Sequence, residues 1–252
     1  MEPKEVYKIK KGVEKVTITH ETKKLLDQQK PTVISITGNI DSVVKWLEKR
    51  CLATNYPVFE SLNENMVSQL ISHVLINREE MSVMLVFNET DPLNKSTVTG
   101  KLLMHPDFTK WAINAGTEFD SKTLSEFIKM NRSCFESKSD AMKLSAELSQ
   151  LRVKVDKEVE KSNDNRGNVK QMLAQQVIEM NIPKTFKMKV PIFKGIEPVV
   201  FEVEIYVNPN NFNVSLVSPE ANDFIQQIRD NVINEQKETI TRLCPELVII
   251  EQ

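Results

Sequence analysis

The feature that most constrains the fold is an alternation of apolar and polar residues over Thr185–Val217, TFKMKVPIFKGIEPVVFEVEIYVNPNNFNVSLV. A period of two is typical of strands that bury one face and expose the other. Lys194 and Gly195 separate the first run from the second, and residues 208–211 (NPNN) separate the second from the third. Glycine, asparagine and proline favour turns. The segment therefore predicts three antiparallel strands that follow one another as a meander.

The polar positions of the second strand predict an exposed acidic face. Glu202 and Glu204 alternate with apolar residues, so both carboxylates are expected on the side away from the core. They must find water, the lysines of the preceding strand, or another chain. Cross-strand pairs of opposite charge contribute only about 0.2–1 kcal/mol each, so they fix register more than they stabilise. Glu202 and Glu204 are therefore candidate residues of an interaction surface.

Hydrophobic periodicity predicts further elements on both sides of the meander. Strands are expected over residues 15–20, 32–37, 73–77, 82–87, 96–104, 151–159 and 247–250. Helices are expected over 41–51, after a cap at Asp120 or Ser121, over 137–148 and over 219–242, with a short helical stretch around 66–71. For 151–159 a continuing charged helix is the alternative, because glutamate and lysine favour helices.

The most turn-rich segment of the chain is residues 162–168, SNDNRGN. Its composition predicts the exposed tip of a hairpin, because a buried segment of this kind would leave backbone groups without partners. Whether residues 169–180 return as a strand or form a helix stays open. The tip adds Asn163, Asp164, Asn165 and Arg166 to the candidate interaction surface.

These elements predict an α+β fold, in which antiparallel β-sheet meanders carry helices packed on one face. A basic leader is expected over residues 1–30, an N-terminal α+β lobe over 31–135, and a C-terminal lobe with the meander and a closing helix over 136–252. One continuous domain is the alternative. A chain of 252 residues is compatible with either arrangement.

Composition and charge narrow the class of protein. Hydrophobic residues make up 40% of the chain and charged residues 27%, which is ordinary for a globular protein, and the net charge is −2. No global positive field therefore attracts nucleic acid or an anionic membrane. Cys51, Cys134 and Cys244 lack the CxxC spacing, which excludes a disulfide framework and a cysteine zinc site and suits a reducing cytoplasm. We expect neither a signal peptide nor a membrane span.

The sequence contains no motif that carries chemistry. There are six glycines, and neither GxGxxG nor a phosphate-binding P-loop occurs. His20, His73 and His105 lie far apart and lack the close pairing that metal sites usually show. No GxSxG elbow is present, and Cys134 has no visible base. We expect no catalytic residue, no metal and no cofactor, and therefore no enzyme.

Three stretches together resemble a known family. They are 105–131 (HPDFTKWAINAGTEFDSKTLSEFIKMN), 182–205 (IPKTFKMKVPIFKGIEPVVFEVEI) and 215–232. The combination resembles the YfdQ-like family, uncharacterised proteins of bacteriophages and prophages. The resemblance covers residues 33–233 and is most specific over Pro183–Gly195. Glu202 and Glu204 stand where the family has a basic strand, and residues 51–71 resemble an insertion.

The resemblance implies a phage accessory protein that acts in the cytoplasm of a bacterial host. We expect a non-enzymatic protein that binds a host protein or a small ligand, for example in counter-defence. The alternative is an accessory factor in phage DNA replication or recombination that contacts nucleic acid, which local lysines at 4–15 and 184–194 keep open. Strand edges favour a homo-oligomer, because pairing an edge satisfies its backbone donors.

Overall fold

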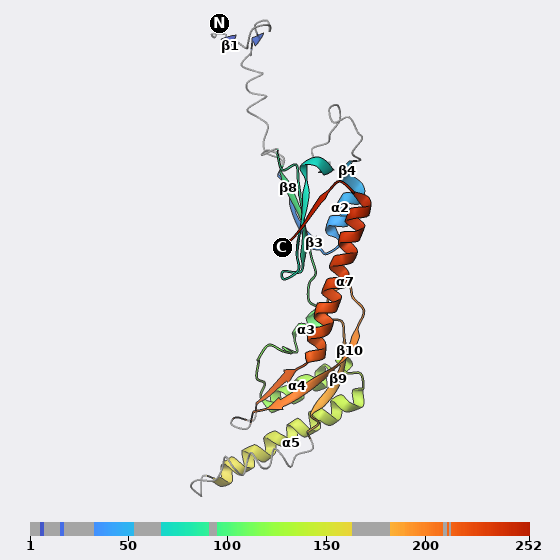
Figure 1. Cartoon of the computed structure of the whole chain (residues 1–252). Coiled ribbons are helices and arrows are strands. Elements are labelled where there is room, and N and C mark those ends of the chain that lie inside the picture. The colour runs from blue at the N-terminus through green and yellow to red at the C-terminus, as the bar shows by residue number, and fades with distance from the viewer. Residues whose placement is uncertain are drawn as a thin grey trace. The chain divides into compact units, whose positions relative to one another are not determined.

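A computed structural model of the chain describes residues 6–7, 16–17, 33–52, 67–90, 95–162, 182–208, 211 and 213–252 (Figure 1). The chain divides into two compact units. The first comprises residues Met1–Lys101 and Ile233–Gln252, and the second comprises Leu102–Val232. The second unit is therefore an insertion in the sequence of the first.

The first unit is built on a five-stranded mixed sheet with strand order β12-β6-β7-β8-β3. Three consecutive strands, β6 (His73–Asn77), β7 (Ser82–Phe87) and β8 (Ser96–Lys101), form an antiparallel meander. The two outer strands are β3 (Ser35–Asn39), parallel to β8, and β12 (Val248–Glu251), parallel to β6. Short pairs join β1 (Val6–Tyr7) to β2 (Val16–Thr17) and β4 (Cys51–Leu52) to β5 (Val67–Ser68).

Two helices supply the apolar residues that cover one face of this sheet. In α2 (Ser42–Arg50), Val43, Val44 and Leu47 recur at helical spacing and are buried. The turn that leads from β3 into α2 lies close to β8 because Gly100 has no side chain: a Cβ there would meet the carbonyl oxygen of Ile40 at 2.5 Å. The last part of α7 (Pro219–Leu243) completes the core. The buried core residues are Val43, Val44, Leu47, Val67, Val74, Ile76, Val83, Leu85, Phe87, Val98, Ile233, Ile240, Cys244 and Leu247.

The second unit contains the predicted meander, with strand order β11-β10-β9. The strands are β9 (Thr185–Val190), β10 (Val199–Val207) and β11 (Val214–Val217), and each pair is antiparallel. One face of the sheet is buried. Its residues are Phe186, Met188, Val190, Phe201, Val203, Val214 and Leu216.

Aromatic side chains from residues 105–135 cover this buried face. Phe135 stacks on Phe186 with ring centroids 4.8 Å apart, and Trp111 meets Phe135 edge-on at 5.7 Å. These residues lie in or beside α3 (Pro106–Thr109), α4 (Ser121–Met130) and the short helix η2 (Arg132–Cys134). The long helix α5 (Lys138–Ser162) packs on α4, where the buried hydroxyls of Ser125 and Ser145 lie 2.9 Å apart.

The α+β fold class predicted from the sequence is confirmed, and so is the antiparallel meander. The sheet of the first unit differs from the predicted antiparallel arrangement at its two outer strands, which pair in parallel with their neighbours. The helix predicted over 219–242 is α7, and Asp120 caps α4 by accepting from the backbone N–H groups of Lys122 and Thr123. The short helix η1 (Gln69–Ile71) occupies part of the predicted stretch around 66–71.

The strand predicted over 151–159 is wrong, because α5 continues through it to Ser162. Ala141, Leu144, Leu148 and Leu151 are all buried at helical spacing, and that repeat overrides the local alternation after Leu151. The first arm of the predicted hairpin is therefore helical, while residues 163–181 lie outside the described part of the chain. The basic leader over 1–30 is described only at β1 and β2.

The boundaries between the two units lie after Lys101 and after Val232, whereas the predicted lobes 31–135 and 136–252 meet after residue 135. A boundary after Phe135 would cut through a shared core, since Phe135 bridges to Met188 and η2 leads directly into α5. The contiguous second unit instead begins after β8 and ends within α7.

Candidate functional site

The open face of the three-stranded sheet carries the predicted acidic residues. Its residues, called here the charged sheet face, are Thr185, Lys187, Lys189, Glu202, Glu204 and Tyr206. Strict alternation separates them from the buried face. Glu202 lies directly opposite Lys187, and Glu204 lies opposite Thr185 on one side and Val217 on the other. The face therefore combines two ammonium groups, two carboxylates and one aromatic ring.

Glu202 is held at a fixed place by the start of α7. Its backbone N–H donates to Oε2 of Glu220 at 2.7 Å, and its carbonyl oxygen accepts from the hydroxyl of Ser218. The same hydroxyl accepts from the backbone N–H of Ala221 at 3.0 Å, which makes Ser218 the cap of the helix. Strand and helix are thereby tied together, so the exposed carboxylate of Glu202 projects from a rigid backbone.

Tyr206 is the large apolar group of the charged sheet face, with 58% of its surface exposed. It lies opposite Ser215 near the turn between β10 and β11. The Glu118 carboxylate closes that turn, because it accepts from the side-chain amides of Asn208 and Asn211, each at 2.8 Å, and of Asn213. These bonds lower the pKa of Glu118 below its ordinary value.

Of the six predicted interaction residues, two lie in the described part of the chain, and these two differ in exposure. Glu202 is exposed, as the alternation predicts. Glu204 is half-buried because it is paired on both sides, with Thr185 and Val217, whereas the pairing with β11 does not reach Glu202. Asn163, Asp164, Asn165 and Arg166 lie outside the described residues. Tyr206 is visible in the sequence as the third outward position of β10, but its pattern alone does not distinguish it from an ordinary surface residue.

A second polar cluster in this unit joins three residues that are close in sequence, His105, Asp107 and Lys110, to the remote Cys134. The Nζ atom of Lys110 donates to Oδ1 of Asp107 at 2.6 Å, and Nδ1 of His105 accepts from the backbone N–H of Asp107 at 3.0 Å. The bond from Lys110 lowers the pKa of Asp107. Burial by itself lowers the pKa of Lys110. The interactions with Asp107 and with the buried free thiol of Cys134 raise it, and the pKa lies above the ordinary value. The cluster stabilises the start of α3 and the adjoining η2.

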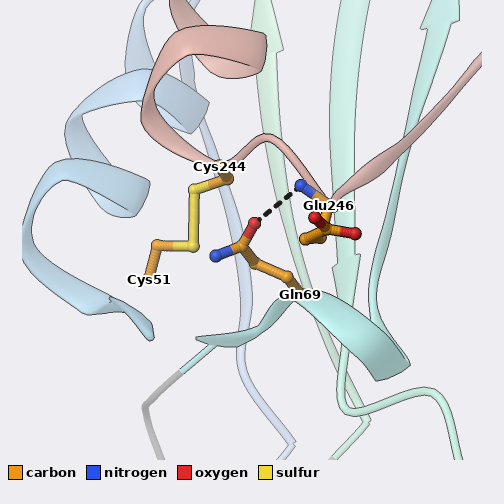
Figure 2. Close-up of a disulfide and its surroundings, with 4 residues drawn as sticks. All are labelled: Cys51, Gln69, Cys244 and Glu246. Atoms are coloured by element: carbon orange, nitrogen blue, oxygen red, sulfur yellow. Dashed lines mark hydrogen bonds between the residues drawn. A yellow bond between two sulfur atoms is a disulfide. The ribbon is translucent and has the colours of Figure 1, made fainter. Parts of the chain in front are cut away.

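In the first unit, Cys51 and Cys244 form a disulfide across 193 residues (Figure 2). Beside it, the Oε1 atom of Gln69 accepts from the backbone N–H of Glu246 at 3.0 Å. The disulfide links the end of α2 to the end of α7, just before β12. This pairing corrects the expectation that the cysteines stay reduced. Sequence spacing could not reveal it, because the contact depends on the tertiary fold.

The histidines have structural partners where the structure describes them. Nδ1 of His73 lies 2.5 Å from Oε2 of Glu89, and His105 caps α3. Across the described residues, no three His, Cys, Asp or Glu side chains gather as a metal ion would require. Within the same residues, every helix is either too short or too polar to cross a membrane.

Comparison with known proteins adds no relative: no family model, no curated protein and no solved structure matches the chain. The resemblance to the YfdQ-like family stays a prediction that rests on the three stretches of sequence that carry it.

Proposed function

We propose that the chain is a non-enzymatic accessory protein that binds another protein through the charged sheet face. The observation that carries this proposal is the exposure of Tyr206 on β10, the strand that also presents Glu202 and Glu204 beside the lysines of β9. Tyrosine is enriched among the residues that dominate binding energy, since it offers a large contact area at low entropic cost. The assignment to a phage and to a bacterial host rests on the family resemblance alone.

The balance of charge on this face favours a protein partner over nucleic acid. Lys187 and Lys189 are matched by Glu202 and Glu204, so the face presents no net positive field to a phosphate backbone. The lysines on β9 and the glutamates on β10 instead suit a partner with the complementary pattern of charges, and such patterns set specificity and association rate.

The size of the face limits the area that it can bury against a partner. Three strands about 4.8 Å apart and six residues of about 3.4 Å each span roughly 300 Å². A standard interface buries about 800 Å² on each partner. The partner must therefore also contact the surrounding turns, or bind only transiently.

The test uses immobilised chain to capture proteins from a lysate of the bacterial host, with quantitative mass spectrometry. Tyr206→Ala and the charge reversal Lys187→Glu are expected to reduce the captured partner at least tenfold. Met130→Ala is the matched control, because Met130 is 84% exposed in the same unit but lies on α4. Direct titration of the purified partner against the same variants then follows.

Two outcomes would overturn the proposal. Equal capture by wild type and Tyr206→Ala would remove the charged sheet face from binding. A salt-dependent shift of DNA by the wild type, lost in Lys187→Glu, would instead support the accessory factor in DNA replication or recombination.

A further inference from the structure

The outer edge of β12 differs from the opposite edge of the same sheet. In the described part of the chain, β12 is paired only with β6, and β3 only with β8. Two rungs cross the open face of the sheet, Val248–His73–Val86–Thr97–Ser35 and Ile250–Leu75–Met84–Thr99–Thr37. Both rungs run from aliphatic residues at β12 to hydroxyl residues at β3. On the open face of the sheet, the β12 end is therefore aliphatic and the β3 end polar.

We propose that two copies of the chain join through this edge, with their β12 strands antiparallel and a two-fold axis at Ile249. The occupant of the edge is a second copy rather than a foreign strand, because the edge is complementary to itself in three respects. These are its backbone groups, its side-chain faces and its one charge, which is neutralised within each copy.

The backbone N–H and C=O groups at the free edge of β12 are complementary to those of a second copy. The N–H of Gln252 donates to the carbonyl of Ile76, so residues 248, 250 and 252 direct their hydrogen-bonding groups toward β6. Ile249 and Glu251 consequently direct theirs toward the free edge. In an antiparallel pair, two residues that face each other in this way exchange both N–H···O bonds. A two-fold axis at Ile249 creates this arrangement between Ile249 and its symmetry mate.

The side chains match in the same register. Ile249 packs partly against the core below the sheet, so Val248 and Ile250 lie on the open face. They are 58% and 45% exposed. The axis at Ile249 sets Val248 of each copy opposite Ile250 of the other. A slip of one residue would place these aliphatic side chains opposite residues of the other face, so the side-chain alternation excludes it.

Charge does not oppose the pairing. Glu251 is the one charged residue of β12, and its carboxylate is already held by Arg78 at 3.1 Å and Lys237 at 2.5 Å. Protected edges usually carry lysine, proline or a bulge. The sequence VIIE contains neither lysine nor proline. The two five-stranded sheets would then form one continuous sheet across the axis.

The first test is the mass of the full chain in solution, measured by sedimentation equilibrium at micromolar concentration. The wild type is expected at twice 28.9 kDa. Val248→Lys is expected to raise the dissociation constant at least tenfold. Val33→Lys is the matched control, since Val33 is 57% exposed beside β3 at the opposite edge, and it should stay dimeric.

The second test separates strand pairing from a general apolar contact. Ile249→Pro removes the N–H that faces the free edge and leaves the bonds to β6 in place. We expect this variant to be monomeric and to have an unchanged far-ultraviolet circular dichroism spectrum. Hydrogen exchange should show the amides of Ile249 and Glu251 protected in the wild type and unprotected in Val248→Lys.

A monomeric wild type would overturn the proposal. So would a dimer that survives Ile249→Pro, or one that Val33→Lys dissociates, because either result assigns assembly to another surface.

Discussion

At the scale of single residues, the contacts that matter most join positions remote in sequence. Cys51 forms a disulfide with Cys244, and the carboxylate of Glu118 accepts hydrogen bonds from the side-chain amides of three asparagines. The first contact restrains the unfolded chain, whereas the second depends on ionisation. Their responses to a reductant and to acid are therefore expected to differ.

Reduction should destabilise the first unit by about 2–4 kcal/mol, because the disulfide restrains a long loop in the unfolded chain. The measurement is thermal unfolding with and without dithiothreitol. Cys51→Ser provides the matched control, since it lacks the cross-link and should show no response to the reductant. Peptide mapping without reduction should find Cys51 joined to Cys244 and Cys134 free. An unlinked pair in that map would contradict the expectation.

Acid should release the turn between β10 and β11. The pKa of Glu118 is depressed in the folded state by its three amide donors, so its contribution is fully present above the ordinary value of about 4.3. That contribution is lost as the pH falls through the lower, folded pKa. The side-chain amide resonances of Asn208, Asn211 and Asn213 should shift together with a midpoint below about 4.3, and Glu118→Gln should abolish the shift. A midpoint above the ordinary value would show that the amides do not favour the carboxylate.

At the scale of elements, α5 shows how two periodicities compete within one segment. Residues 151–155 alternate as a strand would, but Leu151 also continues the helical series of Ala141, Leu144 and Leu148. Helical packing on α4 decides the outcome.

Leu151→Ala should therefore destabilise the second unit by about 2–5 kcal/mol, the usual cost of truncating a buried leucine. Met142→Ala on the same helix is the control, because Met142 is 42% exposed and its loss should cost far less. Chemical denaturation measures both variants. Equal effects of the two substitutions would argue against a buried Leu151.

The elements also show what sequence patterns can predict. The meander, the strands β6 and β7 and the cap of α4 depend on neighbours within a few residues, and the sequence predicts all of them. The position of β12 beside β6, and the bond of Cys51 to Cys244, depend on which distant segments share a core. The same limit applies to the charged sheet face: alternation predicts that Glu202 is exposed, but half-burial of Glu204 depends on its pairing with strands on both sides.

At the scale of the whole molecule, each unit has its own sheet and its own buried core. Units of this kind can unfold in separate steps.

Scanning calorimetry should therefore resolve two transitions. Dithiothreitol should lower only the transition of the first unit, and Leu151→Ala only that of the second. A single transition that both changes move would show that the units unfold as one.

The interrupted sequence of the first unit has a consequence for the order of synthesis. Its core requires Ile233, Ile240, Cys244 and Leu247, which a ribosome adds only after the whole of the inserted unit. The inserted unit is complete before then and can fold as soon as it emerges. Until those four residues emerge, α2 alone covers the apolar face of β6, β7 and β8, so this face stays partly exposed and prone to aggregation after the inserted unit has folded.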